Sequence, residues 1–389
     1  MTRTHLALAI VVGLVAAGSP SRAPLRAQTA DRYQRMLQPW IEQLLQREHR
    51  PGFAIAVVEG NRVVYAHGFG VKRLGRDGPI TTRSLFHMAS ITKPFVATSL
   101  MQLVEKGKVD LDAPVVRYLP YFRMADERYR TITVRQMVTH SSGMPDVDDY
   151  EWDKPQYDDG ALERYVRSLS DRTLLFAPGE EFHYSNMAFE ILGAVIAKVS
   201  GQSFDGYVQD QILTPLRMKD STLFVRRADA TLLTWGHELD EHDRPFPSRV
   251  FPYNWIHSPS SNLHSNVLDM ARWAIANMNH GELDGRRILQ ASTHELMWKR
   301  PRDLGGPPPA PARPSPVALS WFLGEHRRTA MVGHSGGDTG YATDLAMIPE
   351  KKIAVVWMMN SDWRGSGGGS LTRAALDVAL GEEPQPIQP

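Results

Sequence analysis

The 389-residue chain contains no cysteine, which excludes disulfides, thiolate catalysis, thiolate-bound zinc and a cysteine lipid anchor. Charge of one sign is not in excess either, because 44 Lys and Arg are balanced by 43 Asp and Glu. A nucleic-acid-binding protein would carry a basic stripe, so we expect no nucleic-acid partner. The 14 histidines form no His-Glu-x-x-His motif, and we expect neither a metal nor a cofactor.

A long apolar run is also missing. The apolar stretch 6–17 is shorter than the roughly 20 residues that span a bilayer. It follows Arg3 and His5 and precedes Gly18-Ser19-Pro20, which is the layout of a secretory signal peptide. Cleavage after Gly18 or after Ala27 fits, and we assign residues 1–27 to the signal. We therefore expect an exported protein, periplasmic or secreted, without a stable membrane span after cleavage.

Hydrophobic periodicity predicts an α+β fold with strands near both chain ends. An amphipathic helix over 31–47 precedes two strands, 53–58 and 62–67, which Gly60-Asn61 joins in a tight turn. The middle of the chain predicts helices at 95–106, 134–138, 162–169, 187–199 and 267–278. Strands return at 319–323, 329–333, 341–348 and 353–358, and a helix over 371–380 closes the chain.

This order predicts an antiparallel sheet built from both chain ends and flanked by helices. The sheet domain is assigned to 28–110 and 315–389, and the largely helical inserted domain to 111–314. The segment 305–316, GGPPPAPARPSP, is typical of a stiff linker or surface loop. The acidic segment 145–159 does not match the twelve-residue calcium-loop pattern, so a solvated acidic loop is the favoured interpretation.

The strongest local motif is Ala89-Ser90-Ile91-Thr92-Lys93-Pro94, which marks the start of a helix. Ser90 and Lys93 are three residues apart and therefore share one helix face. A neutral lysine held close to a serine can accept its proton, and burial or a neighbouring cation can make a lysine neutral. The motif fits equally a capping serine followed by a solvated lysine one turn later.

Tyr184-Ser185-Asn186 precedes the helical pattern 187–199. A tyrosine phenol can relay a proton when ammonium charge nearby holds it as phenolate. Asn186 offers two donors and an acceptor, which suit a substrate amide carbonyl and an oriented lysine. The alternative is a helix cap beside a core tyrosine.

Gly333-His334-Ser335-Gly336-Gly337 lies between two β runs. Glycines there would let a substrate lie close to the strand backbone. An N–H of this strand could complete an oxyanion hole with the N–H of Ser90. The alternative is a glycine-rich turn with an incidental histidine.

Together the three motifs, in this order, resemble the serine β-lactamase and penicillin-binding-protein superfamily. The resemblance is to the class C β-lactamase branch with its esterases and D-specific peptidases, and it covers nearly all of residues 30–380. Further phrases support it, among them Thr139-His140-Ser141-Ser142-Gly143-Met144 and Phe176-Ala177-Pro178-Gly179. The fold it implies, a sheet with flanking helices and a helical domain, agrees with the periodicity.

The resemblance implies a role for each motif residue. Ser90 would be the nucleophile that forms an acyl-enzyme, and Lys93 would accept its proton. Tyr184 would pass a proton to the leaving group and activate water. The N–H groups of Ser90 and Gly337 would form the oxyanion hole. The residues that would bind the substrate are Asn186, His334, Ser335, Gly336 and Gly337.

One departure from the family pattern concerns His334, where many β-lactamases and transpeptidases have lysine. Unperturbed histidine titrates near pH 6.5 and lacks a permanent charge for a substrate carboxylate. We therefore expect a small-molecule or peptide substrate, and a carboxylesterase or D-amino-acid peptidase before a true class C-type β-lactamase. A penicillin-binding protein without turnover is the other alternative. If His334 titrates normally, activity on carboxylate-bearing substrates should rise as pH falls toward 6.

Overall fold

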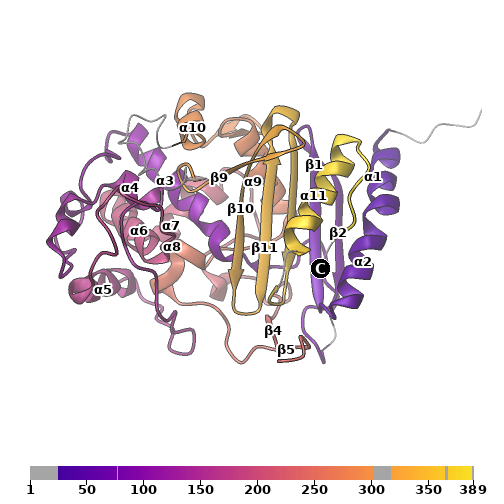
Figure 1. The fold of residues 1–389 in the computed structure, drawn as a ribbon, viewed down its shortest axis with the longest axis horizontal. Helices are drawn as coiled ribbons and strands as arrows, with labels where there is room; N and C mark the ends of the chain where they lie inside the picture. Colours follow the sequence, from indigo (N-terminus) through magenta and orange to yellow (C-terminus); the bar gives the residue numbers. More distant parts are fainter. Residues whose placement is uncertain (1–24, 77, 301–316, 364–366, 388–389) are drawn as a thin grey trace, which may run out of the picture.

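A six-stranded antiparallel sheet lies at the centre of the computed structural model, which describes residues 25–76, 78–300, 317–363 and 367–387 (Figure 1). The strand order is β2-β1-β12-β11-β10-β9. The strands are β1 (Gly52–Glu59), β2 (Arg62–Gly70), β9 (Phe322–His326), β10 (Thr329–Asp338), β11 (Tyr341–Ile348) and β12 (Ile353–Met359). The prediction of an antiparallel sheet from both chain ends is confirmed, because β1 pairs directly with β12. Residues 1–24 of the predicted signal peptide (1–27) and the segment 305–316 lie outside the described residues.

Both faces of the central strands are buried. Along β1, Ala54, Ala56 and Val58 belong to the larger hydrophobic core, which extends into the helical part. The residues that alternate with them, Phe53, Ile55 and Val57, belong to a second core on the opposite face of the sheet. Because side chains alternate along a strand, a strand buried on both faces appears in sequence as one apolar run.

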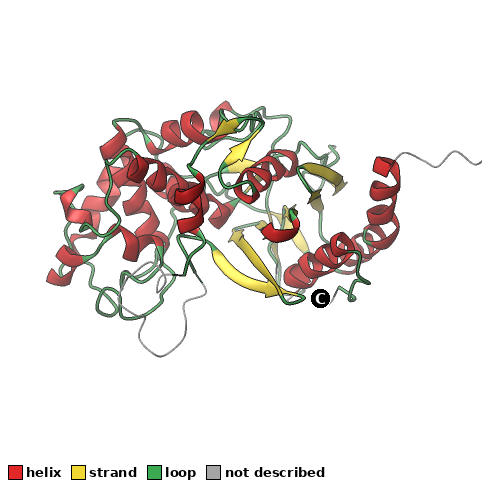
Figure 2. Cartoon of the chain, turned by 90° about the horizontal axis from the view of Figure 1, so that it is seen from above, coloured by secondary structure: helices red, strands yellow, loops and turns green. Residues whose placement is uncertain are grey.

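Three helices cover the second core at one end of the molecule: α1 (Leu25–Met36), α2 (Gln38–Arg47) and α11 (Gly367–Leu380) (Figures 1 and 2). The prediction of one helix over 31–47 is wrong in this detail. The helix is divided at Leu37, and Pro39 lies in the first turn of α2, where its missing N–H costs little.

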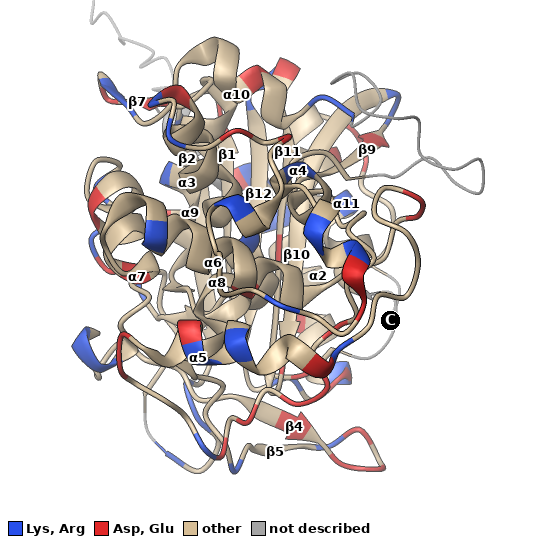
Figure 3. Ribbon diagram, turned by 90° about the vertical axis from the view of Figure 1, so that its left-hand side faces the viewer, with Lys and Arg blue, Asp and Glu red and all other residues tan. Residues whose placement is uncertain are grey.

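The other face of the sheet carries the remaining helices. They are α3 (Lys93–Glu105), α4 (Val134–Val138), α5 (Ala161–Ser168), α6 (Asn186–Ser200), α7 (Phe204–Val208), α8 (Ser258–Ser261), α9 (Val267–Met278) and α10 (Ala291–Met297). Figure 3 views this helical part, where Lys and Arg are interspersed with Asp and Glu. Each of the five helices predicted for the middle of the chain is present within two residues at either end.

Loop segments also form short antiparallel strand pairs. The sequence did not predict these pairs. They are β3 (Phe86–His87) with β6 (His264–Ser265), β4 (His237–Leu239) with β5 (Pro245–Pro247), and β7 (Glu282–Leu283) with β8 (Arg286–Arg287). The pair β3–β6 holds the chain just before Ser90 against the segment just after α8. In the described part of the chain, no helix is long and apolar enough to cross a membrane.

Candidate active site

Ser90 and Lys93 lie at the start of α3, on the face of the sheet that carries the helical part. Ser90 belongs to a short 3-10 helix, η1 (Ala89–Thr92), and Lys93 is the first residue of α3. Lys93 Nζ lies 2.9 Å from Ser90 Oγ, in hydrogen-bond contact. Ser90 does not cap the helix, so the alternative of a capping serine with a solvated lysine is wrong: the Lys93 residue is fully buried.

The backbone before Ser90 has an unusual conformation. Ala89 has φ of +47°, in the left-handed region that residues with a Cβ rarely adopt. Thr92 Oγ1 donates to the Ala89 carbonyl at 2.7 Å, which closes this turn from inside. Such strain persists only where surrounding contacts fix it, and it is common at functional sites.

The position of the Lys93 amine is fixed by contacts other than an ion pair. Its Nζ donates to the Ser260 carbonyl of α8 at 2.9 Å and lies 5.0 Å from the Tyr184 ring centroid. Among the described residues, no carboxylate oxygen lies within ion-pair distance of this nitrogen. The amine is therefore aimed at Ser90 by a backbone acceptor and an aromatic face.

Tyr184 lies just before α6, and its ring stacks on His140 with centroids 4.2 Å apart. His140 is a residue that sequence reasoning did not assign to the site, although it lies in the phrase Thr139–Met144. Its Nδ1 accepts from the Ser185 N–H at 3.1 Å. Burial and the charge of Lys93 hold the pKa of His140 well below its usual value, so the ring is a neutral support for Tyr184.

Ser185 and Asn186 are held by the chain on either side of them. Ser185 is the N-cap of α6, accepting from the Ala188 N–H at 3.1 Å, as the helix-cap alternative predicted. Asn186 donates from its backbone N–H and from Nδ2 to Asp146, at 2.7 Å and 3.1 Å. Asp146 is therefore an anchor of the site, and the interpretation of 145–159 as a purely solvated acidic loop is wrong for this residue.

His334, Ser335, Gly336 and Gly337 all lie within β10, so the interpretation of this segment as a turn is wrong. A Cβ on Gly336 would lie 2.4 Å from the Met88 carbonyl oxygen and 2.5 Å from Thr343 Oγ1. Glycine is thus required for β10 to approach the turn that carries Ser90. Ser335, Gly336 and Gly337 also line a cavity of about 750 Å³ that extends to Trp357 and Trp363.

The end of β10 is fixed by Asp338. Its Oδ2 accepts from Ser261 Oγ and contacts His87 Nε2, each at 2.9 Å. These contacts join β10, α8 and β3 immediately after Gly337. Sequence reasoning assigned no role to His87 or Asp338, because the three segments are far apart along the chain.

The electrostatics of His334 differ from the expectation for an ordinary histidine. Burial, followed by the charge of Lys93, lowers the pKa of His334 to about 3. Its Nδ1 donates to the Ser335 carbonyl at 2.6 Å, which leaves Nε2 as the acceptor. The ring is therefore neutral at pH 6. The prediction that His334 gains positive charge near that pH is wrong.

Two of the three motifs contribute buried side-chain atoms that have no hydrogen-bond partner among the described residues. These atoms are Tyr184 Oη, Asn186 Oδ1 and His334 Nε2. Buried polar atoms are nearly always paired, so unpaired ones mark positions that a ligand or water completes. A phenol, an amide oxygen and an imidazole nitrogen can together bind a polar substrate and move a proton.

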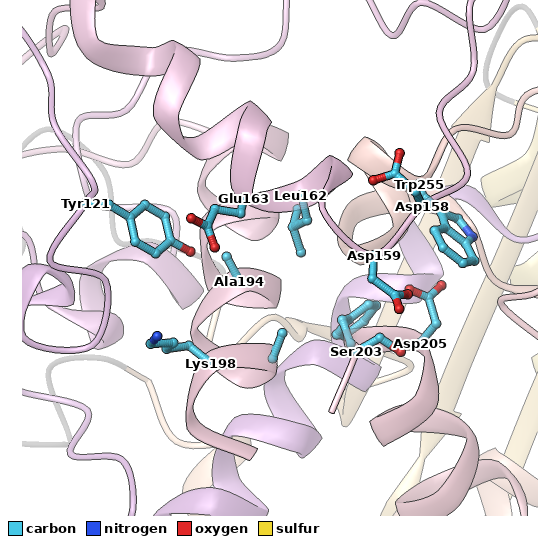
Figure 4. Close-up of a pocket in the computed structure, with 12 residues that line it drawn as sticks. Tyr121, Asp158, Asp159, Leu162, Glu163, Ala194, Lys198, Ser203, Asp205 and Trp255 are labelled. Atoms are coloured by element: carbon cyan, nitrogen blue, oxygen red, sulfur yellow. The ribbon is translucent and has the colours of Figure 1, made fainter. Parts of the chain in front are cut away.

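A second cavity, of about 210 Å³, lies between α5, α6 and α7 (Figure 4). It is rich in carboxylates and contains none of the predicted site residues; Asp158, Asp159, Glu163 and Asp205 line it together with Trp255. Trp255 donates to the hydroxyl of Tyr253, and Tyr253 is buried. No group of three metal-binding side chains occurs within the described ranges.

Known proteins resemble this chain in sequence and in structure. A family model described as Beta-lactamase matches residues 37–380. Protein flp of Staphylococcus aureus (strain MW2) is 27% identical over 328 residues, 84% of this chain and 63% of that protein, so this chain spans less than two thirds of its length. Penicillin-binding protein 4 of Amycolatopsis lactamdurans is 28% identical over 365 residues, 89% of this chain and 93% of that protein. The octameric penicillin-binding protein homologue from Pyrococcus abyssi matches 90% of this chain and 78% of its own, with a TM-score of 0.74 and 28% identity.

Proposed function

Because this chain belongs to the Beta-lactamase family, whose members are generally serine hydrolases, we propose that it forms an acyl-enzyme on Ser90 and hydrolyses an ester, amide or lactam. The substrate classes that we favour are carboxylic esters and peptides with D-amino acids. The observation that supports this most directly is the 2.9 Å contact between Ser90 Oγ and the buried Lys93 Nζ. Nucleophile and base within hydrogen-bond distance are the signature of covalent catalysis.

In acylation, Ser90 Oγ attacks the substrate carbonyl carbon while its proton passes to the neutral amine of Lys93. The Ser90 and Gly337 N–H groups would hold the oxygen on which negative charge develops. Tyr184 Oη, which has no partner among the described residues, would give a proton to the leaving group. The C–O or C–N bond of the substrate then breaks and leaves the acyl group on Ser90.

In deacylation, water attacks the acyl carbon and loses a proton to Tyr184, which acylation left as a phenolate. The bond between the acyl carbon and Ser90 Oγ then breaks, the acid product leaves, and Ser90 Oγ recovers the proton that Lys93 accepted. Asn186 Oδ1 is the acceptor available to orient the substrate or the lysine, because Asp146 occupies the amide nitrogen. The neutral His334 supplies an acceptor rather than a charge. This arrangement favours substrates that do not depend on a carboxylate.

The test is intact-protein mass spectrometry of wild type and S90A after separate addition of a fluorophosphonate, a β-lactam and a p-nitrophenyl ester. We expect wild-type adducts that S90A lacks, with turnover of the ester. A persistent β-lactam adduct without turnover of any probe would favour a penicillin-binding protein, and rapid β-lactam turnover a β-lactamase. No adduct with any probe would overturn the proposal.

Export of the protein is part of the proposal, on the strength of the sequence of residues 1–27. Expression with the native N-terminus and mass determination of the mature chain would test it. A mature protein that begins after Gly18 or Ala27 supports export, whereas an intact N-terminus in the cytoplasm contradicts it.

A further inference from the structure

Glu190 is a fully buried carboxyl group behind Lys93. It lies on α6 four residues after Asn186, so the two share one face of the helix. Its Oε1 accepts from Ser260 Oγ at 2.6 Å and contacts His257 Nδ1 at 3.1 Å. Nothing in the mechanism above uses this group.

Ser260 joins Glu190 to Lys93. Its hydroxyl donates to Glu190, and its backbone carbonyl accepts from Lys93 Nζ at 2.9 Å. A shift of the Ser260 backbone would therefore move the acceptor that aims Lys93 at Ser90. The contact with His257, in the turn η7 (Trp255–His257) that leads into α8, fixes Glu190 from the same side.

The charge of Glu190 is costly to bury unless opposite charge or hydrogen bonds compensate it. Burial raises the pKa of Glu190, while His257, Ser260 and the charge of Lys93 lower it. Lys93 has no carboxylate within ion-pair distance in the described part of the chain. Glu190 is thus a buried acidic group whose charge, when present, interacts with that of Lys93.

Other titratable groups also surround this pair. Tyr150 and Tyr165 lie edge-on to His257, with ring centroids 4.7 Å and 5.5 Å away. Charged or titratable groups on the segments around Glu190 include Lys93, His140, Asp146, Tyr150, Tyr165, Asp205 and His257. Asp146 and Asp205 contact Asn186 and Ser258 respectively, rather than Glu190.

We infer that Glu190 is a positioning residue for the reaction: when ionised, it is the interior counter-charge that favours the ammonium form of Lys93, and through Ser260 it keeps Lys93 directed at Ser90. The inference rests on the proposed function, in which neutral Lys93 accepts the Ser90 proton. Acylation by wild type should then rise with pH as Lys93 loses its proton. Removing the charge of Glu190 should make the neutral amine available at lower pH.

The test is the pH dependence of the acylation rate with a p-nitrophenyl ester, measured in the pre-steady-state burst between pH 5 and 10. E190Q keeps the size and an acceptor oxygen but removes the charge. We expect the acidic limb of its pH–rate profile, where the acylation rate rises with pH, to move to lower pH by about one unit. This is the shift expected when a nearby opposite charge is lost. S260A, which removes only the hydroxyl that stabilises the ionised carboxylate, should move the limb the same way by a smaller amount.

D269N is the matched control, because Asp269 is a buried carboxylate that accepts from Ser221 Oγ at 2.8 Å and has no contact with Lys93. Its acidic limb should coincide with that of wild type. Coincidence of the E190Q limb with wild type would overturn the inference, and if E190Q does not fold, the S260A limb decides in the same way. A wild type that never acylates Ser90 would instead overturn the proposed function, so the two failures are distinguishable.

Discussion

At the scale of single residues, the site combines a buried amine with neutral acceptors. Burial, and after it the charge of Lys93, lowers the pKa of both His140 and His334. The sequence pointed to Ser90, Lys93, Tyr184 and His334 through the resemblance of three ordered motifs to a known family, whereas residue type and spacing left an alternative open at each motif. It did not identify Asp146 or Glu190, because a carboxylate in a loop or on an apolar helix carries no local sign of what it contacts.

His334 leads to a prediction about pH. We expect the ratio of kcat/KM for a carboxylate-bearing ester to that for its neutral counterpart to stay constant from pH 7.5 to 5.5. The physical reason is that the pKa of His334, lowered to about 3, lies below this whole range. Steady-state kinetics with the two esters on wild type measure the ratio.

H334Q serves as the control, because glutamine does not titrate and its profile should superimpose on that of wild type. A ratio that rises toward pH 6 in wild type but not in H334Q would show that His334 does gain charge. That result would agree instead with the pH dependence expected for a histidine of ordinary pKa.

At the scale of elements, the close approach of α6 to α8 positions the lysine. Gly193 of α6 faces Pro259 of α8, and a Cβ on Gly193 would lie 2.1 Å from Pro259 Cγ. The next residue, Ser260, holds Lys93. A change in the distance between α6 and α8 would therefore displace the carbonyl group that binds the Lys93 amine.

We therefore predict that G193A is destabilised and acylates more slowly. Alanine normally stabilises a helix interior by about 1 kcal/mol relative to glycine. Here overpacking against a rigid ring should dominate and cost about 1–3 kcal/mol, and a displaced Ser260 should slow acylation about tenfold or more. Urea denaturation and burst kinetics measure the two effects.

The double variant G193A/P259A removes the ring that the new methyl group meets. It should recover most of the acylation rate lost in G193A. If the double variant is as slow as G193A, the contact between Gly193 and Pro259 is not the cause.

Predictability from sequence also differed between elements. The helix α9 and the strand β11 match their predicted ranges, because each has one clear hydrophobic period and defined breaks. Strand β10 was ended too early, at Gly333, because Gly336 and Gly337 resemble a turn in sequence. Glycine is needed at 336 because a Cβ there would meet the Met88 carbonyl and Thr343, and Met88 is far from Gly336 along the chain.

At the scale of the whole molecule, buried titratable groups make stability depend on pH in opposite directions. Burial raises the pKa of Asp205 to about 7 and that of Asp344 to about 6. Their contribution to stability is complete below the unfolded value of about 4 and is lost as pH rises through the folded value. Burial lowers the pKa of His264 and His294 to about 3, so their contribution is lost as pH falls below about 6.5.

The difference between D205N and wild type isolates the contribution of Asp205. Between pH 5 and 8, the free energy of unfolding of wild type should fall by about 2–3 kcal/mol relative to D205N. Urea denaturation at both pH values measures this. D158N changes an exposed carboxylate of the same cavity, whose pKa is lowered by Arg164, and should show no such difference; equal behaviour of D205N and D158N would contradict the prediction.

The pairing of β1 with β12 has a consequence for the order of events during biosynthesis. Phe53 is paired with Met359, about 300 residues later, and the edge of the site formed by β10 also comes from the C-terminal part. Pairing between such distant segments is slow, because a long loop must close before the contact stabilises it. A nascent chain that has already made Ser90 and Lys93 still lacks His334 and Gly337, so the candidate site is assembled only with the last strands to leave the ribosome.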